Sequence, residues 1–342
     1  MPTSIPKEPR IAVIGAGAWG TSLARHLANK GLPVRLWAYE REVVEGIRAT
    51  HENTFFLSGV KLPSSLHVTE SLQEAVQGID LLLFAVPSHA ARSVLQQLGS
   101  LLPHSIPIVS ATKGIEEHTF KLMSQVIHDT LPPDLHPTVC VLSGPSFAIE
   151  VCHDQPTAIV LAGQEPAIVR SLQHVFMTPC FRVYAGTDVI GVQLGGALKN
   201  VVALAAGVVD GLNLGHNARA ALITRGLAEM IRLGVALGAD PKTFYGLSGV
   251  GDLVLTCTGP LSRNHTVGVR LGRGETLSGI LKETQAVAEG VRTSVAAAGL
   301  ARRHKIEMPI VQAVCDVLFE GKSPRGAVSE LMERAAKEEV EG

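Results

Sequence analysis

Short apolar runs alternate with amphipathic segments in the first half of the chain. Val34–Trp37 is one predicted strand, with Arg35 as its single charged residue, and residues 80–86 form a stretch that is apolar after Asp80 and ends at Pro87. Strands that are apolar throughout and are separated by helices indicate a parallel sheet covered on both faces, a doubly wound α/β domain. The pattern predicts further strands over residues 11–14, 106–110, 139–143 and 157–162, and helices over residues 20–29, 40–49, 88–102 and 117–130.

The pattern changes near residue 189, where runs typical of strands almost disappear. Asp240 precedes Pro241 and Ser323 precedes Pro324, each a capping residue followed by proline at the first helical position. We therefore predict a Rossmann-type domain over residues 1–188 and an all-α domain over residues 189–342. The predicted helices of the second domain cover residues 191–210, 217–237, 240–245, 277–304, 308–319 and 323–339.

Composition narrows the class of protein. A length of 342 residues suits two domains, and a net charge of -1 gives no basic footprint for nucleic acid. Apolar runs such as residues 201–209 are shorter than the roughly 20 residues that span a bilayer, so we predict no membrane span. The five scattered cysteines form no Cys-x-x-Cys pair and are typical of buried thiols in a reducing compartment. We expect a cytoplasmic protein.

A glycine-rich motif follows the first predicted strand and opens the first predicted helix. It reads Gly-Ala-Gly-Ala-Trp-Gly and spans residues 15–20. Such glycines permit a tight turn and a close approach to a pyrophosphate, which the helix N-terminus then faces. A purely structural glycine turn is the alternative. The predicted dinucleotide contacts in this motif are Gly15, Gly17, Ala18, Trp19 and Gly20.

The end of the second predicted strand leaves the choice between NAD and NADP open. An acid there binds the ribose hydroxyls of NAD, whereas an arginine accommodates the 2′-phosphate of NADP. Glu40 and Arg41 supply both types. Tyr39 could contact the adenine or be an ordinary surface tyrosine.

Three other features carry chemistry. Lys199 lies in an uncharged segment, residues 190–200, so it has either a buried ionic partner or a proton that the protein uses. Lys113 follows a predicted strand at the sheet edge where ligands bind, although most loop lysines are simply solvated. Residues 262–264, Ser-Arg-Asn, suit a phosphate group but also occur in surface turns. The histidines lack the spacing of metal ligands, and we predict no metal.

Together these segments resemble the bacterial NAD(P)-dependent glycerol-3-phosphate dehydrogenases over nearly the whole chain. Tyr39 stands where members of that family often have histidine or arginine. The resemblance implies a fold like that of 6-phosphogluconate dehydrogenase and NADH or NADPH as cofactor. The matching segments cover residues 15–21, 86–89, 111–114, 143–147, 198–200, 217–219, 251–257 and 289–292.

The resemblance also implies residue roles. Lys199 is the general acid and base, and Asp252, otherwise typical of a helix cap, contacts the substrate and orients Lys199. The implied substrate contacts are Lys113, Gly144, Ser146, Lys199, Asp252, Ser262, Arg263 and Asn264. The further implied cofactor contacts are Lys113, Ala148, Arg263, Val287 and Glu289.

The implied reaction is the reversible reduction of dihydroxyacetone phosphate to sn-glycerol 3-phosphate, which feeds glycerophospholipid synthesis. An apolar helical second domain also makes a homodimer plausible. Two alternatives remain: another two-domain dehydrogenase, such as one acting on a 3-hydroxy acid, and a nucleotide-sensing protein without turnover. A sensor has no need of Lys113, Lys199 and Asp252 together.

Overall fold

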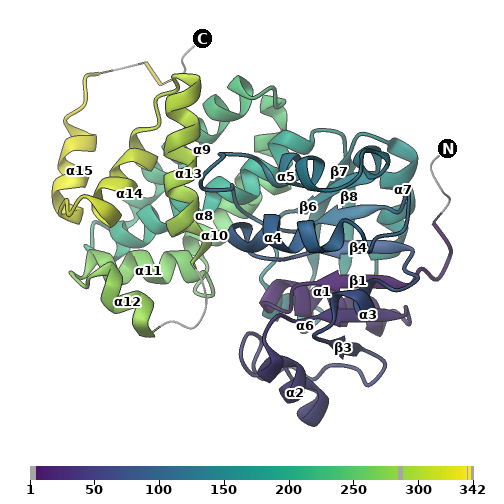
Figure 1. The fold of residues 1–342 in the computed structure, drawn as a ribbon. Helices are drawn as coiled ribbons and strands as arrows, with labels where there is room; N and C mark the ends of the chain where they lie inside the picture. The colour runs from purple at the N-terminus through teal and green to yellow at the C-terminus, as the bar shows by residue number, and fades with distance from the viewer. Residues whose placement is uncertain (1–4, 284–287, 337, 340–342) are drawn as a thin grey trace.

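The computed structural model describes residues 5–283, 288–336, 338 and 339. A sheet with helices on both faces forms the first part of the chain, and a group of helices packed beside it forms the second (Figure 1). The predicted fold class, a Rossmann-type α/β domain followed by an all-α domain, is confirmed. The domain boundary at 188/189 stays a prediction, and the first helix of the helical part begins at Val189.

One eight-stranded sheet organises the first part, in the order β3-β2-β1-β4-β5-β6-β7-β8. All neighbouring strands are parallel except β6 and β7. The expectation of a wholly parallel sheet is therefore wrong at that pair. A five-residue helix and a left-handed turn at Asp154 bring β7 back along β6 in the opposite direction. The strands are β1 Ile11–Ile14, β2 Val34–Trp37, β3 His67–Thr69, β4 Leu81–Phe84, β5 Ile108–Ser110, β6 Val139–Ser143, β7 Thr157–Gly163 and β8 Phe181–Gly186.

Both faces of this sheet are buried. Ile11 and Val13 of β1 pack in one hydrophobic core, and Ala12 and Ile14 pack in another on the opposite face. Alternate side chains of a strand point to opposite faces, so a strand with two cores must be apolar throughout. The covering helices are α1 Ala18–Asn29, α2 Arg41–Thr50, α3 Leu72–Val76, α4 Ser88–Leu98, α5 Met123–Thr130, α6 Ala148–Cys152 and α7 Pro166–Phe176, with a 3-10 turn η1 at Pro133–Thr138.

One predicted helix of this part is wrong in its first half. Helicity was expected from residue 117, but α5 begins only at Met123. The preceding residues form a loop closed by an antiparallel bridge between Ile115 and Leu122, with Phe120 in the left-handed region at φ 61°. Strands β3 and β8, at the two edges of the sheet, were not predicted.

The helical part is built around α8, Val189–Gly211, which packs on α9, α10, α11 and α13. α8 is long and apolar enough to span a membrane, but 83% of its apolar window is buried inside the fold, as expected of a core helix. The other helices are α9 Gly215–Ala236, α10 Asp252–Thr258, α11 Arg263–Gly272, α12 Leu277–Glu283, α13 Glu289–His304, α14 Pro309–Phe319 and α15 Pro324–Met332, with short turns η2 Pro241–Tyr245 and η3 Leu247–Gly251.

Both predicted helix starts are confirmed. The side chain of Asp240 accepts a hydrogen bond from the backbone N–H of Lys242, and that of Ser323 accepts one from Gly326. The predicted helix over residues 277–304 is instead two helices, α12 and α13, and α15 ends at Met332 rather than at residue 339. Helices α10 and α11 were not predicted.

Candidate active site

The glycine-rich motif forms a tight turn between β1 and α1. Gly15 has φ of 113°, and a Cβ there would lie 2.7 Å from the carbonyl oxygen of Ala85, the residue after β4. Nothing lies within 4 Å of the position where a Cβ of Gly17 would stand, and no side chain caps the N-terminus of α1. The buried indole N–H of Trp19 has no hydrogen-bond partner among the described residues. Free backbone donors and open space beside Gly17 fit the pyrophosphate of a dinucleotide.

Two lysine amines meet on one carboxylate where the two parts of the molecule join. Asp252, the first residue of α10, is completely buried. Its Oδ2 accepts a hydrogen bond of 2.9 Å from Nζ of Lys113, and its Oδ1 accepts one from Nζ of Lys199. Lys113 follows β5, whereas Lys199 comes from the middle of α8. The carboxylate therefore links the sheet to the helical part, and its side chain does not serve as a helix cap.

Lys199 has both properties that its sequence context left as alternatives. It has a buried ionic partner, and its environment also prepares it to exchange a proton. Burial lowers its pKa to about 7, because desolvation disfavours the ammonium and Lys113 repels it, although Asp252 stabilises the charge. A lysine with a pKa near neutrality can donate and accept a proton at physiological pH.

Lys113 also connects this cluster to the dinucleotide turn. Its Nζ lies 5.9 Å from the centre of the Trp19 ring, within the range of a cation–π contact, and donates a hydrogen bond of 3.1 Å to the carbonyl of Gly144. The hydroxyl of Ser146 donates to the same carbonyl at 2.9 Å. Lys113, Gly144 and Ser146, all proposed for the substrate, are thus within one network.

Asn264 and its neighbours form a second group of polar residues at the start of α11. The Asn264 amide donates to Oδ1 of Asn200 and accepts the backbone N–H of Gly290, both at 3.0 Å. Ser262 caps α11 by accepting a hydrogen bond from the backbone N–H of His265. Ser262 keeps its hydroxyl proton and Asn264 keeps one amide proton for a ligand.

Asn200 is a residue whose role the sequence did not single out. It follows Lys199 on α8 and is buried, so it ties the Asn264 group to the helix that carries the lysine. Its presence in the matching segment of residues 198–200 was the available signal.

Arg263 and Glu289 lie near one another at the same junction. Arg263 has an exposed side chain that forms no hydrogen bond with any residue the structure describes, and it is close enough to Glu289 for their charges to interact. Glu289, at the start of α13, accepts hydrogen bonds from the backbone N–H and the hydroxyl of Ser88 at 3.2 and 2.8 Å. Burial raises the pKa of the Glu289 carboxyl. The unpaired guanidinium is available to an anionic ligand.

The remaining predicted contacts divide into three cases. Ala148 packs with Ala18 in a small apolar cluster beside the glycine turn. Tyr39 follows β2 and is 80% exposed, and its ring lies edge-on to that of Trp37 with 6.3 Å between ring centres, so its outer face is open to a ligand. Val287 lies outside the described residues. Over the described ranges, no group of three or more His, Cys, Asp or Glu side chains lies close enough to bind a metal ion.

Comparisons with known proteins agree with this geometry. The model of the NAD-dependent glycerol-3-phosphate dehydrogenase N-terminus matches residues 10–169, and that of the C-terminus matches residues 188–329. The glycerol-3-phosphate dehydrogenase (NAD(P)+) of Geobacter sulfurreducens is 57% identical over 330 residues, 96% of this chain and 98% of the relative. Its counterpart in Myxococcus xanthus is 49% identical over 97% of this chain and 99% of the relative.

Solved structures give the same result. The crystal structure of glycerol-3-phosphate dehydrogenase from Coxiella burnetii superposes with a TM-score of 0.92 at 40% identity, covering 96% of this chain and all of that one. The resemblance found in the sequence is confirmed across both parts of the fold. The chain belongs to the NAD-dependent glycerol-3-phosphate dehydrogenase family.

Proposed function

We propose that this protein reduces dihydroxyacetone phosphate reversibly to sn-glycerol 3-phosphate, with NADH or NADPH as the hydride donor. The observation that carries the proposal is the pair of lysines on Asp252, because a ketone reduction needs a proton donor beside the reacting carbonyl. The glycine turn lies next to that pair, with Trp19 under the Lys113 amine.

The chain's own groups fit a bound dinucleotide. The N-terminus of α1 and the open space at Gly17 receive the pyrophosphate, and Ala18 and Ala148 form part of the apolar wall beside it. When bound, the dinucleotide supplies the hydride that is added to C2 of the ketone. Glu289 accepts hydrogen bonds from Ser88 and lies near Arg263, where it can contact the cofactor from the helical side.

Lys199 donates or accepts the proton, depending on the direction of the reaction. As hydride reaches C2, negative charge develops on the C2 oxygen, and the Lys199 ammonium donates its proton to that oxygen. In the reverse direction the neutral amine removes the proton from the alcohol. Asp252 orients the amine, and the Lys113 ammonium adds positive charge that stabilises the developing alkoxide.

The substrate phosphate has a separate set of donors. Arg263 offers a planar guanidinium without a hydrogen-bond partner among the described residues, and within the same ranges Ser262 and Asn264 each retain one proton to donate. Binding energy from a phosphate remote from C2 holds the ketone in the reacting position.

We extend the proposal to the cellular setting. The protein is divided into a dinucleotide domain at 1–188 and a substrate domain at 189–342, and it works in the cytoplasm to supply glycerophospholipid synthesis. A homodimer is supported by large apolar side chains exposed on the helical part, among them Val235, Tyr245, Val254 and Leu261. Sedimentation velocity tests the dimer, since a monomer at micromolar concentration contradicts it.

The reaction is tested by following NADH or NADPH absorbance when dihydroxyacetone phosphate is added to the purified protein. We expect oxidation of at least one cofactor, and far slower oxidation with unphosphorylated dihydroxyacetone. Turnover of 2-keto or 3-keto acids in preference to dihydroxyacetone phosphate would mean that Arg263 binds a substrate carboxylate and not a phosphate. No oxidation with any of these substrates contradicts the proposed reaction.

A further inference from the structure

The loop that carries Lys113 is fixed at both of its sides by charged residues outside the active site. This β5–α5 loop, residues 114–122, begins directly after Lys113 and is closed by the bridge between Ile115 and Leu122. The backbone N–H of Glu116 donates to the carbonyl of Lys121 at 3.0 Å, and that of Phe120 donates to the carbonyl of Glu116 at 2.9 Å. The loop is therefore closed by its own backbone hydrogen bonds, and Lys113 immediately precedes it.

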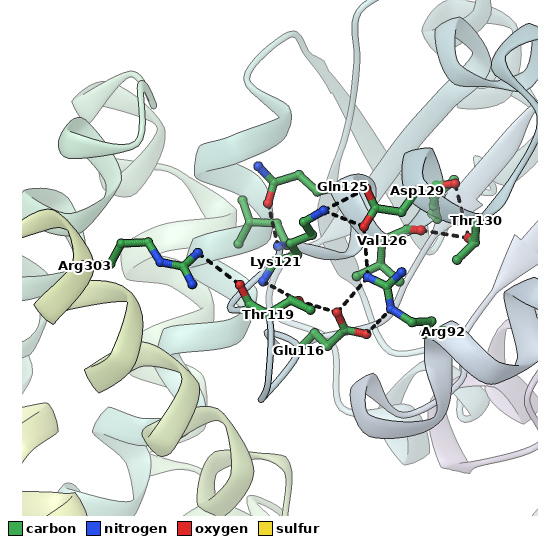
Figure 2. A network of polar contacts seen from close by, with 11 residues as sticks. Arg92, Glu116, Thr119, Lys121, Gln125, Val126, Asp129, Thr130 and Arg303 are labelled. Atoms are coloured by element: carbon green, nitrogen blue, oxygen red, sulfur yellow. Dashed lines mark hydrogen bonds and ion pairs between the residues drawn. The ribbon is translucent and has the colours of Figure 1, made fainter.

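An ionic network anchors the loop to the sheet domain (Figure 2). Arg92 of α4 donates from Nε and from one terminal nitrogen to the two carboxylate oxygens of Glu116, both at 2.8 Å, and the same terminal nitrogen reaches Asp129 of α5 at 3.0 Å. Lys121 also pairs with Asp129, and the hydroxyl of Thr119 donates to Glu116. A paired, two-pronged arginine fixes the direction of the carboxylate as well as its position.

The opposite side of the loop docks on α13 of the helical part. The Phe120 ring occupies the space that a Cβ of Gly299 would need, so a larger residue at position 299 would displace the ring. The Arg303 guanidinium lies 4.9 Å from the centre of the Phe120 ring. It also donates to the carbonyl of Thr119 at 3.1 Å, the bond that Figure 2 draws between these two residues.

The same two helices meet again beside the active site. Glu289 begins α13, and it accepts hydrogen bonds from Ser88 at the start of α4, one turn before Arg92. A second ion pair, between Arg292 of α13 and Glu117 of the loop, measures 3.1 Å. The loop thus lies between α4 and α13. Arg92 of α4 binds one side of it, and Arg292 and Arg303 of α13 bind the other. The two helices also contact each other directly, through Glu289 and Ser88.

We propose that Arg92 and Arg303 are positioning residues for the reaction: acting through the β5–α5 loop, they hold the Lys113 amine against Asp252 when the two domains are together. The inference rests on the proposed function. The alternative is that the network only stabilises the fold, in which case its loss lowers stability without altering the chemistry.

The test compares Arg92→Met and Arg303→Met with a matched control, Arg10→Met. Arg10 forms an equally two-pronged pair with Asp80 at 2.9 Å, but this pair precedes β1 and β4 at the sheet edge opposite Lys113. Each variant is assayed for kcat/KM with dihydroxyacetone phosphate across pH, for the Kd of the reduced cofactor and for the free energy of unfolding.

We expect Arg92→Met and, less strongly, Arg303→Met to lower kcat/KM by about tenfold or more with a much smaller change in the cofactor Kd, because a small displacement of a charged group costs a large factor in rate and Lys113 is only one of several implied cofactor contacts. The pH midpoint of reduction should also rise, since Lys199 then loses part of the repulsion from Lys113. Arg92→Lys should recover part of the rate, and Arg10→Met should lose stability only.

Two results overturn the inference. One is an Arg92→Met enzyme whose rate and pH midpoint match those of Arg10→Met. The other is a crystal structure of Arg92→Met in which Lys113 keeps its hydrogen bond to Asp252. The crystal structure decides the role of the loop even if the wild-type protein fails to reduce dihydroxyacetone phosphate, a failure that counts against the proposed reaction alone.

Discussion

Replacing Lys113 by methionine should move the pH dependence of the reaction in a calculable way. Lys113 and Lys199 bind the two oxygens of one carboxylate, Lys113 at 2.9 Å, so their charges are close neighbours, and we take a separation of about 5 Å for the calculation. Two unit charges at that separation repel by about 3 kcal/mol at an effective dielectric constant of about 20. Since about 1.4 kcal/mol corresponds to one pKa unit, removing Lys113 should raise the pKa of Lys199 by about 2 units.

The direction of the effect follows from the proton that each reaction needs. Reduction requires the Lys199 ammonium, so its rate falls as pH rises through the pKa, which is about 7 in the intact protein. In Lys113→Met the fall should occur near pH 9 by the same reasoning. Oxidation of glycerol 3-phosphate requires the neutral amine and should show the opposite dependence, with its rise displaced by the same amount.

The assay is kcat/KM for dihydroxyacetone phosphate, followed by loss of NADH or NADPH absorbance from about pH 5.5 to 10. The substrate phosphate has a pKa near 6, so it is fully ionised over the informative range. Lys113→Arg is the control, because it keeps the positive charge and should keep the midpoint near 7. If the pH midpoint of Lys113→Met is unchanged, the repulsion between Lys113 and Lys199 does not set the pKa of Lys199. If neither variant shows a midpoint, Lys199 is not the group that titrates.

Three further changes test other parts of the structure. Arg263→Ala should raise KM for dihydroxyacetone phosphate by about tenfold or more with a smaller effect on kcat, because one charge-assisted bond to phosphate is lost; steady-state kinetics with an unchanged KM contradict this. Burial raises the pKa of Glu229 from 4.5 to about 7, so its stabilising contribution is present below about pH 4.5 and is lost as pH rises through 7. As pH rises from 4.5 to 8, the free energy of unfolding of Glu229→Gln, measured with urea, should therefore increase by up to about 3 kcal/mol relative to that of the wild type. A difference between the two proteins that does not change with pH disproves the assignment. Lys30→Met should lower the free energy of unfolding by about 1 kcal/mol, because its amine donates to the carbonyls of Val175 and Met177 at the C-terminal end of α7, and thermal melting checks this.

The features that could be predicted from the sequence are those whose cause is local. Gly15 and the residues around it were interpretable because strand, turn and helix follow one another directly along the chain. Lys199 stood out because no charged residue lies near it in sequence, and the structure buries it as that context indicated. Its partner Asp252 is 53 residues away, so the pairing itself has no local signal.

The features that were missed depend on contacts between distant segments. Helix α11 contains Gly268 and Gly272, which lower helix propensity, yet both glycines allow its backbone to touch that of α8 closely. The β5–α5 loop has the spacing of a helix, but Glu116 and Phe120 find partners on α4 and α13 that a helix would not reach. The antiparallel direction of β7 relative to β6 also has no local signal, because the apolar pattern of a strand does not depend on the direction in which the strand runs.

The sharing of Asp252 has a consequence for the cost of turnover. With both amines protonated, the buried group of three carries one positive charge, and after Lys199 has given up its proton the group is neutral. In neither condition does the carboxylate remain alone, because Lys113 still balances it. The protein interior therefore never contains an uncompensated negative charge between catalytic cycles. Loss and return of the Lys199 proton should require little reorganisation of the surrounding residues.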